Sequence, residues 1–272
     1  MRQIAIYGKA GIGKSTTTQN TVAAIAEMGK QVLLLGCDPK ADCTRLLLHG
    51  KAQTTVRDVL QQFGPGCLPE MICSTGFGGV TCVEAGGPEL GVGCDGKGLT
   101  TSIQTLSEMG LYEDDLDFVL YDVPGDVACG DFTMPIREGY VQEIYLEVSG
   151  EYTALYAANN LCKIIKKFAE QGQVRLGGII CNSRVCDNEE FLVYQFAKQV
   201  NSKLIRFIPR DNIVQRAEIK AKTVIDYDTY STQAEAYRNL AHKIAYNDFF
   251  TVPTPLTMDD LEDLMKKYGL PD

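Results

Sequence analysis

The chain has 272 residues, and its 26 basic and 35 acidic side chains give a formal net charge of −9 at neutral pH. This length allows one large domain or two small ones, with ample chain for a buried core. The acidic balance and a pI near 4.9 argue against nucleic acid as a main partner, because binding to a phosphate backbone needs an excess of lysine and arginine. Apolar runs are too short to span a membrane, and a strand and a glycine loop begin by residue 8, so we expect a cytoplasmic protein without a signal peptide.

Short apolar runs alternate with longer helical patterns along most of the chain. The expected strands are residues 3–7, 31–35, 117–121, 143–148, 176–180 and 204–207, and the expected helices include residues 14–28, 151–170 and 189–200. This alternation predicts βαβ units, and strands that are apolar almost throughout are typical of a sheet buried on both faces. We predict one α/β domain over residues 1–272, with a mostly parallel, doubly wound sheet.

Two segments stand apart from this alternation. Residues 64–98 are rich in Gly, Pro and Cys, and we interpret them as a functional loop region inside the same domain. Near the end of the chain, Thr257 as N-cap and Asp260 in a capping box predict a helix over about residues 257–268.

The strongest local motif is GKAGIGKST, which begins at residue 8 and matches G-x-x-x-x-G-K-[ST] between an expected strand and an expected helix. Its glycines let backbone N–H groups surround phosphate oxygens, and the helix dipole favours the negative charge. We expect Lys14 to reach the β- and γ-phosphates and Ser15 to place its hydroxyl on Mg²⁺. The motif predicts a P-loop NTPase whose nucleotide-binding residues include Gly8, Lys9, Ala10, Gly11, Ile12, Gly13, Lys14, Ser15 and Thr16.

Charged residues near this loop add candidates for catalysis. Lys9 is either a solvated charge or a lysine that crosses a dimer interface to the partner's nucleotide. Asp122 follows an expected strand and is the natural Walker B carboxylate for magnesium. Asp38 and Asp126 are candidates to orient or deprotonate the attacking water, and each could instead cap a helix.

Ten cysteines, beside two histidines and no tryptophan, are the unusual feature of the composition. No pair has the Cys-x-x-Cys spacing of a local metal site, and burial as a small hydrophobe is the ordinary explanation. Cys94 and Cys129 differ because both lie in glycine-rich segments, whose N–H groups can hydrogen-bond to the sulfur ligands of an iron–sulfur cluster. Two thiolates supply half of a four-cysteine site, so a cluster would require two chains. Two structural cysteines are the alternative.

Beyond these motifs, the chain resembles the nitrogenase iron protein (dinitrogenase reductase) family from residue 3 to about residue 268. The matching stretches include CDPKAD (37–42), GGPELGVGC (86–94), YEDDLDFVLYDV (112–123), MPIRE (134–138), ALYAANN (154–160), RLGGIICNSR (175–184) and PRDNIVQRAEI (209–219). The resemblance implies a homodimer that holds one [4Fe–4S] cluster between its subunits and couples MgATP hydrolysis to one-electron transfer.

The same resemblance implies the partners of the reaction. Ferredoxin or flavodoxin would donate the electron, and the catalytic metalloprotein of nitrogenase would by default accept it. A nitrogenase-like system is the alternative: the nickel-tetrapyrrole cofactor cyclase of methanogens, a protochlorophyllide-type reductase or a carbon–sulfur-bond reductase. A partitioning or metallochaperone ATPase shares the second loop lysine, but we expect such a protein to lack Cys94 and Cys129.

The resemblance also assigns functional residues of the family to the matching positions of this chain. Cys94 and Cys129 match the cluster ligands, residues 122–126 match the second switch, and the P-loop residues match those that handle phosphates and Mg²⁺. The first switch is matched by Asp38, Lys40 and Asp42. The adenine-pocket segment is matched by Asn182, Pro209, Asp211, Gln215, Glu218 and Gln233. Without the resemblance, Gln215 and Gln233 would be interpreted as part of a solvated helix face.

Several positions depart from the family pattern. They are Ala10 and Cys43 in place of glycine and serine, Lys97 in place of an arginine that helps to dock the partner, Pro124 in place of leucine, and Asp131 in place of glycine. Residues 147–149 and 152–153 replace segments that usually contain Cys and Met. Because most of these changes are expected near the cluster, they predict an altered partner surface with largely intact ATP machinery.

Overall fold

A computed structural model of the chain describes residues 1–86, 97–112, 115–123, 134–172 and 174–269. The strands are β1 (Arg2–Gly8), β2 (Val32–Gly36), β3 (Ser74–Thr75), β4 (Thr81–Glu84), β5 (Phe118–Asp122), β6 (Glu143–Val148), β7 (Arg175–Asn182) and β8 (Leu204–Ile208). The helices are α1 (Lys14–Glu27), α2 (Val56–Phe63), α3 (Lys97–Glu108), α4 (Met134–Arg137), α5 (Tyr152–Ala169), α6 (Glu189–Gln199), α7 (Asn212–Ile219), α8 (Val224–Tyr227), α9 (Thr232–Ala245) and α10 (Met258–Tyr268).

These strands form one sheet, which has eight strands in the described part of the chain, in the order β3-β4-β2-β5-β1-β6-β7-β8. β3 runs antiparallel to β4, and the other pairs are parallel. β1 lies inside the sheet, where Ile4 pairs with Leu120 of β5 on one side and Glu143 of β6 on the other. The sheet therefore confirms the predicted α/β class and its mostly parallel strands.

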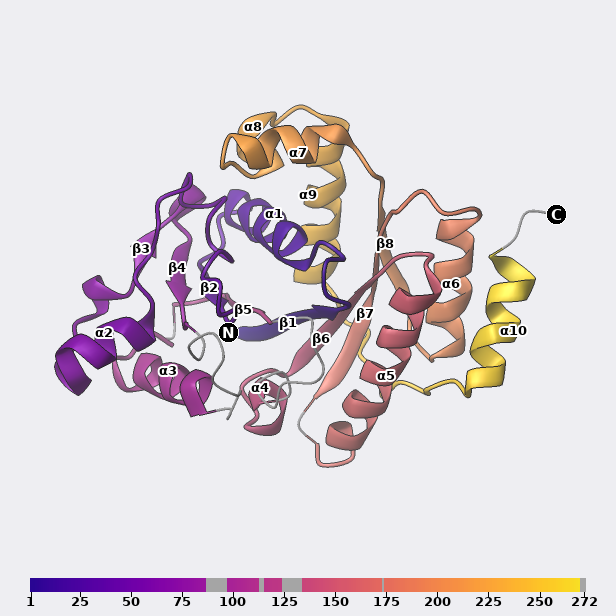
Figure 1. Cartoon of the computed structure of the whole chain (residues 1–272), viewed down its shortest axis with the longest axis horizontal. Helices are drawn as coiled ribbons and strands as arrows, with labels where there is room; N and C mark the ends of the chain where they lie inside the picture. The colour runs from indigo at the N-terminus through magenta and orange to yellow at the C-terminus, as the bar shows by residue number, and fades with distance from the viewer. Residues whose placement is uncertain (87–96, 113–114, 124–133, 173, 270–272) are drawn as a thin grey trace.

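Helices cover both faces of the sheet. In Figure 1, α1 and α7–α9 lie on one side, whereas α3, α5, α6 and α10 lie on the other. Side chains of β1 alternate between two buried clusters: Ala5 and Tyr7 pack with residues of α3, α5 and α6, and Ile4 and Ile6 pack with residues of α1 and α9. This period of two explains why the strands are apolar throughout, and it confirms the doubly wound arrangement.

Predicted and observed elements differ most in residues 64–98. The expected loop region contains β3 and β4, and β4 pairs with β2 from Leu33↔Thr81 to Gly36↔Glu84, so the loop prediction is wrong for these strands. β4 has only four residues, too few to give a periodic signal in the sequence. The segment forms a strand because it pairs with β2. By contrast, α1, α5 and α6 end within one residue of the predicted boundaries.

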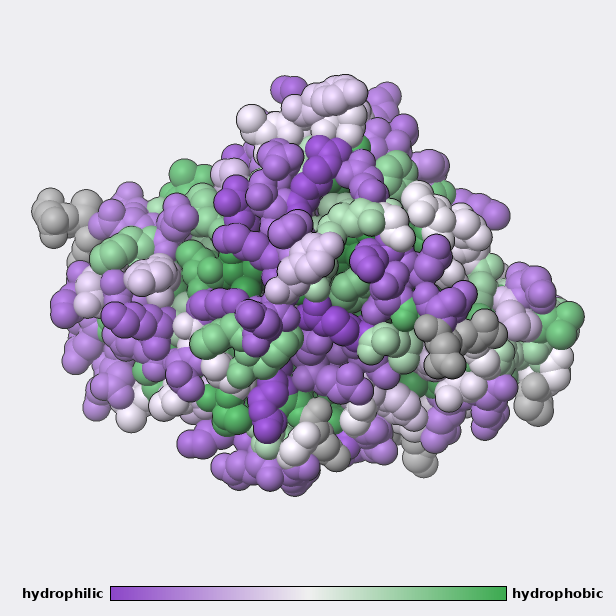
Figure 2. All heavy atoms as spheres, turned by 180° about the vertical axis from the view of Figure 1, so that it is seen from behind, coloured by the Kyte–Doolittle hydropathy of each residue, from purple (hydrophilic) through white to green (hydrophobic). Residues whose placement is uncertain are grey.

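The surface fits the acidic, weakly hydrophilic composition. On the face in Figure 2, hydrophilic residues predominate and apolar residues form small groups among them. Among the helices that the structure describes, none has both the length and the apolar character that crossing a membrane requires.

Candidate functional site

The P-loop connects the end of β1 to the start of α1, at the carboxyl edge of the sheet. Gly8 packs so closely on β6 that a methyl group there would collide with the carbonyl oxygen of Glu147. Gly13 is the N-cap of α1 with φ 116°, a left-handed conformation that L side chains rarely adopt, and a methyl group there would collide with Asn182. No side chain caps the first turn of α1, so its backbone N–H groups are available to an anion.

Side chains of the P-loop point in different directions. Lys14 is 7% exposed, and its Nζ donates to the carbonyl oxygen of Lys9 at 3.4 Å. Lys9 itself donates to Thr153 Oγ1 of α5 at 2.7 Å, so in this chain it contacts its own subunit. Thr16 donates to Glu218 Oε1 of α7 at 2.6 Å. Lys14 is thus a buried cation at the start of α1, as a phosphate-binding lysine would be, whereas Thr16 connects the loop to α7.

Ala10 is one of the departures from the family pattern, and the backbone accommodates it. Among the described non-glycine residues with positive φ, Ala10 does not occur. A position with negative φ accepts alanine without strain. The missing glycine therefore leaves the loop conformation intact.

Three buried carboxylates lie near the carboxyl ends of β4, β5 and β6. Glu84, Asp122 and Glu147 are at most 1% exposed, and each keeps one oxygen without a hydrogen-bond partner in the described structure. Burial raises the pKa of Glu84 and of Glu147 to about 7, and that of Asp122 to about 6. This edge of the sheet therefore holds acidic groups that a cation would stabilise.

Asp122 has the surroundings of a magnesium ligand. Burial raises the pKa of its carboxyl, the neighbouring side chains of Ser15 and Cys43 lower it, and its Oδ2 has no hydrogen-bond partner in the described structure. A serine hydroxyl beside a carboxylate is a donor set that Mg²⁺ prefers, and the buried, unpartnered oxygen offers it a position. The two residues predicted to bind magnesium, Ser15 and Asp122, thus fit the ion.

The raised pKa values predict that stability falls as the pH rises. Glu147 has a pKa of about 7 in the folded protein against an ordinary value of 4.5, so the folded state holds the proton more tightly. The resulting stability is complete below pH 4.5 and is lost as the pH rises to 7 and above, by about 3 kcal/mol for this group. We expect the urea midpoint of nucleotide-free protein to fall between pH 5 and pH 8, and to fall less for Glu147→Gln. Equal pH slopes for the two proteins would contradict the burial of an ionisable Glu147.

The residues predicted for the first switch lie in the turn that follows β2. Asp38 Oδ1 accepts a hydrogen bond from the Lys40 backbone N–H at 2.9 Å, and Ala41 has φ 51°. The far end of this segment is held by Glu84, which accepts from both the backbone N–H and the hydroxyl of Thr44, at 2.8 and 2.7 Å. Asp42 and Lys40 are exposed. The segment is thus fixed at its end and strained within, a combination found in switch regions.

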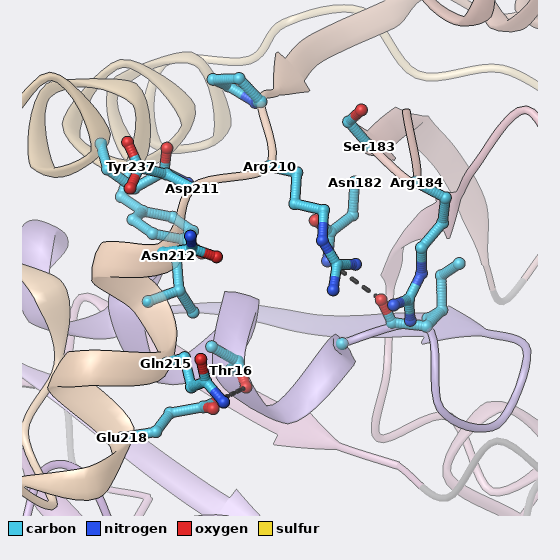
Figure 3. Close-up of a pocket in the computed structure, with 15 residues that line it drawn as sticks. Thr16, Asn182, Ser183, Arg184, Arg210, Asp211, Asn212, Gln215, Glu218 and Tyr237 are labelled. Carbon is cyan, nitrogen blue, oxygen red and sulfur yellow. Dashed lines mark hydrogen bonds between the residues drawn. The ribbon is translucent and has the colours of Figure 1, made fainter. Parts of the chain in front are cut away.

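A cavity of about 340 Å³ lies beside the P-loop, between it and α7. Every residue predicted for the adenine pocket lines it: Asn182, Pro209, Asp211, Gln215, Glu218 and Gln233. Ile12, Gly13 and Thr16 line it from the P-loop side. Figure 3 shows these side chains around one space. The structure therefore brings together residues that lie far apart in the sequence.

The side chain of Gln233 is only 2% exposed. Its burial contradicts the interpretation of Gln233 as part of a solvated helix face. Its Nε2 is buried without a hydrogen-bond partner in the described structure. A buried amide donor costs free energy unless a ligand pairs with it. Gln233 thus offers a donor that suits a ring nitrogen of a purine base. Gln215 is exposed and lines the mouth of the cavity.

Sequence reasoning missed several lining residues. They are Ser183, Arg184, Arg210, Asn212, Val214 and Tyr237. Arg184 hydrogen-bonds to the carbonyl oxygen of Gly11, so it braces the P-loop from the β7 side. Arg184 and Arg210 each adjoin a predicted residue or lie two positions from one, which is the signal that could have found them.

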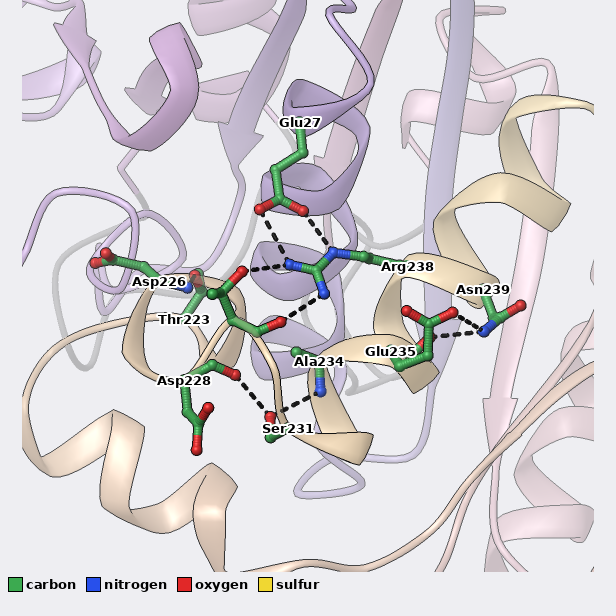
Figure 4. A network of polar contacts seen from close by, with 10 residues as sticks. Glu27, Thr223, Asp226, Asp228, Ser231, Ala234, Glu235, Arg238 and Asn239 are labelled. Carbon is green, nitrogen blue, oxygen red and sulfur yellow. Dashed lines mark hydrogen bonds and ion pairs between the residues drawn. The ribbon is translucent and has the colours of Figure 1, made fainter.

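Polar contacts hold the outer wall of the cavity against α1. Asn20 accepts from the Val224 backbone N–H at 2.7 Å in a buried position. At the other end of α1, Arg238 of α9 donates to Glu27 at 2.7 Å and to the Thr229 carbonyl oxygen at 2.6 Å (Figure 4). Because α1 begins at the P-loop, these contacts fix the wall relative to the phosphate site.

Three predicted site residues, Cys94, Asp126 and Cys129, lie outside the described residues, as do Pro124 and Asp131.

Eight other cysteines are described, and all are free thiols. Burial raises the pKa of Cys82 and Cys162 to about 12, and that of Cys73 to about 11. A thiol in such surroundings is a poor metal ligand, because the thiolate is the binding form. Within the described ranges, no three His, Cys, Asp or Glu side chains gather into a group that could hold a metal ion.

A glycine-rich loop of P-loop sequence at the end of a central parallel strand, a buried lysine, a buried carboxylate at the end of β5 and a neighbouring cavity define a P-loop nucleotide-binding domain. The fold is shared with solved ATPases. The septum site-determining protein MinD from Pyrococcus horikoshii, complexed with Mg-ADP, is 22% identical, with a TM-score of 0.72 over 89% of this chain and 95% of that one. MinD from Aquifex aeolicus is 19% identical, with a TM-score of 0.69 over 92% and 98%. A ParA family ATPase from Chlorobium tepidum is 15% identical, with a TM-score of 0.67 over 89% and 97%.

The family itself is shown by sequence. Residues 2–271 match the family of 4Fe-4S iron–sulfur cluster binding proteins, NifH/frxC family. The chain belongs to this family, and it has the fold of a P-loop NTPase. The resemblance to the nitrogenase iron protein family is thereby confirmed.

Proposed function

We propose that the protein is an ATP-dependent iron–sulfur reductase that works as a homodimer. The match over residues 2–271 to a family of 4Fe–4S cluster binding proteins carries the proposal. In the proposed dimer, Cys94 and Cys129 of both subunits would together hold a single [4Fe–4S] cluster. Ferredoxin or flavodoxin would supply one electron to the dimer, which would pass it to a partner metalloprotein while MgATP and water become MgADP and phosphate. The cluster supplies the one-electron chemistry, and the chain supplies nucleotide binding and the switches.

The nucleotide site supports the ATP-dependent part of this proposal. In this proposal Lys14, buried at the start of α1, binds the β- and γ-phosphates, Ser15 and Asp122 bind Mg²⁺, and the cavity residues bind the base. Asp38 and Asp126 are the proposed residues that orient the attacking water. Lys9 would have to leave Thr153 to reach the nucleotide of the partner subunit, so we propose that this exposed hydrogen bond breaks when the dimer closes.

The partner is proposed to be a nitrogenase or nitrogenase-like catalytic metalloprotein. Nitrogenase is the default, and the departures at Lys97, Pro124 and Asp131 favour a surface that differs from that of typical family members. Lysine keeps the charge of the replaced arginine but lacks its planar fork, so it cannot reproduce a bidentate contact.

Anaerobic purification tests the proposal. We expect a dimer with about four iron atoms and an EPR signal that appears after reduction with dithionite. Reconstitution with nitrogenase and with each nitrogenase-like partner should then show ATP-dependent electron transfer to one of them. An iron-free dimer that hydrolyses ATP would instead indicate the partitioning or metallochaperone class.

A further inference from the structure

Glu147 has no role in the proposal above, although it lies directly beneath the P-loop. It belongs to β6, where it pairs with Gly8 at the end of β1, and its side chain is 0% exposed. Its Oε1 accepts two hydrogen bonds, from Thr17 Oγ1 of α1 at 3.0 Å and from Asn182 Nδ2 of β7 at 2.7 Å. A buried carboxylate is costly, so its presence calls for a function.

The two partners of Asn182 fix the orientation of its amide. Asn182 Nδ2 donates to the Ile12 carbonyl oxygen at 3.0 Å as well as to Glu147 Oε1. A backbone carbonyl accepts but never donates, and Glu147 Oε1 already accepts from Thr17, so the amide must present its NH₂ group to both. Any proton on Glu147 would sit on the unpartnered Oε2, so the orientation is the same in both protonation states.

With both amide hydrogens used, Asn182 presents its carbonyl oxygen on its other side. Asn182 lines the cavity, and in Figure 3 its amide is directed toward the space between β7 and α7. An oxygen fixed in this way attracts an exocyclic amine and repels a carbonyl group, because it can only accept. Adenine carries an amine at its 6-position, whereas hypoxanthine and guanine carry a carbonyl there.

We propose that Glu147 is a positioning residue for base specificity: by holding the NH₂ group of Asn182, it turns the Asn182 carbonyl oxygen toward the base, so that the cavity selects a 6-amino purine. This inference rests on the proposed nucleotide site. Without Glu147, the Ile12 carbonyl at 3.0 Å would alone oppose rotation of the amide, because the shorter of its two hydrogen bonds would be lost. The rotated amide, which presents NH₂ to the base, would then cost less free energy and could pair with a 6-carbonyl purine.

ATP and ITP are the probes that test this role, because the two nucleotides differ at the purine 6-position. Their magnesium complexes would be titrated calorimetrically into the anaerobically purified dimer. We expect the wild type to bind ATP about tenfold more tightly than ITP, since a mismatched polar pair costs on the order of a factor of ten or more. In Glu147→Leu, the ratio should fall to about 2. In Glu147→Gln, which keeps an acceptor for Asn182, the preference should remain.

The variant Asn182→Ala provides the second part of this test. It should abolish the preference on its own, and adding Glu147→Leu should change the ratio no further, because both variants remove the same interaction. A purely structural role of Glu147 would weaken both nucleotides equally and leave the ratio unchanged. If Glu147→Leu does not fold, Glu147→Ala replaces it, both alone and in combination with Asn182→Ala.

Each result decides between the proposals. Unchanged ATP preference in Glu147→Leu, additive effects with Asn182→Ala, or a wild type without preference would overturn the role of Glu147 and leave the nucleotide site standing. A wild type that binds neither nucleotide would overturn the nucleotide site itself.

Discussion

Replacing Lys14 by glutamine is expected to weaken MgATP binding about a hundredfold while leaving the iron content of the dimer unchanged. Lys14 is buried at the start of α1, so its charge acts with little screening by solvent. Glutamine can donate a hydrogen bond but lacks the charge, and charge-assisted hydrogen bonds contribute up to about 3 kcal/mol each, which corresponds to about two factors of ten. Calorimetric titration with MgATP and iron analysis of the same preparation would measure both quantities.

Lys266→Gln is the matched control for this substitution. Lys266 is exposed on α10 and contacts Glu262 at 3.6 Å, far from the P-loop in the fold (Figure 1). It loses the same charge from the protein, so any effect of net charge alone would appear in both variants. Undiminished affinity of Lys14→Gln for MgATP would count against the phosphate role of this lysine.

Changing Cys129 or Cys94 to serine is expected to remove the [4Fe–4S] cluster altogether. Each substitution deletes two of the four proposed ligands, because the two subunits contribute the same residue. The loss would be measured as iron content and as the EPR signal of the reduced dimer. ATP binding should persist, since the nucleotide site is built from other segments.

The described cysteines supply the controls. Cys67 and Cys162 are buried, and burial raises the pKa of Cys162 to about 12, so neither is expected to bind iron. Cys67→Ser and Cys162→Ala should keep iron near the wild-type value. A normal cluster in Cys129→Ser, or its loss in Cys67→Ser, would refute the ligand assignment.

Local patterns predicted much of this fold because the relevant signals are local. The P-loop is contiguous, and the apolar strands and long amphipathic helices carry their own periodicity. Glu84 and Glu147 were not predictable in the same way. A glutamate in a strand usually faces solvent, and only the assembled sheet shows that Glu147 contacts Thr17 and Asn182, which lie 130 and 35 residues away.

The adenine-pocket residues show a related limit. Gln233 resembles any polar position on a helix, and its burial depends on the packing of α9 against α1. Family resemblance singled it out where composition and spacing could not. Arg184 and Arg210 also line the pocket, and their positions likewise depend on which chain segments meet at the carboxyl edge of the sheet.

The place of β1 within the sheet has a consequence for biosynthesis. Its partners β5 and β6 are made more than a hundred residues after it, because Ile4 pairs with Leu120 and Glu143. Until those strands have left the ribosome, the first strand has neither of its neighbours, and an apolar segment stays exposed. The nascent chain therefore acquires its ATP site late, because the cavity also needs residues as far along the chain as Gln233, and chaperones have that interval in which to act.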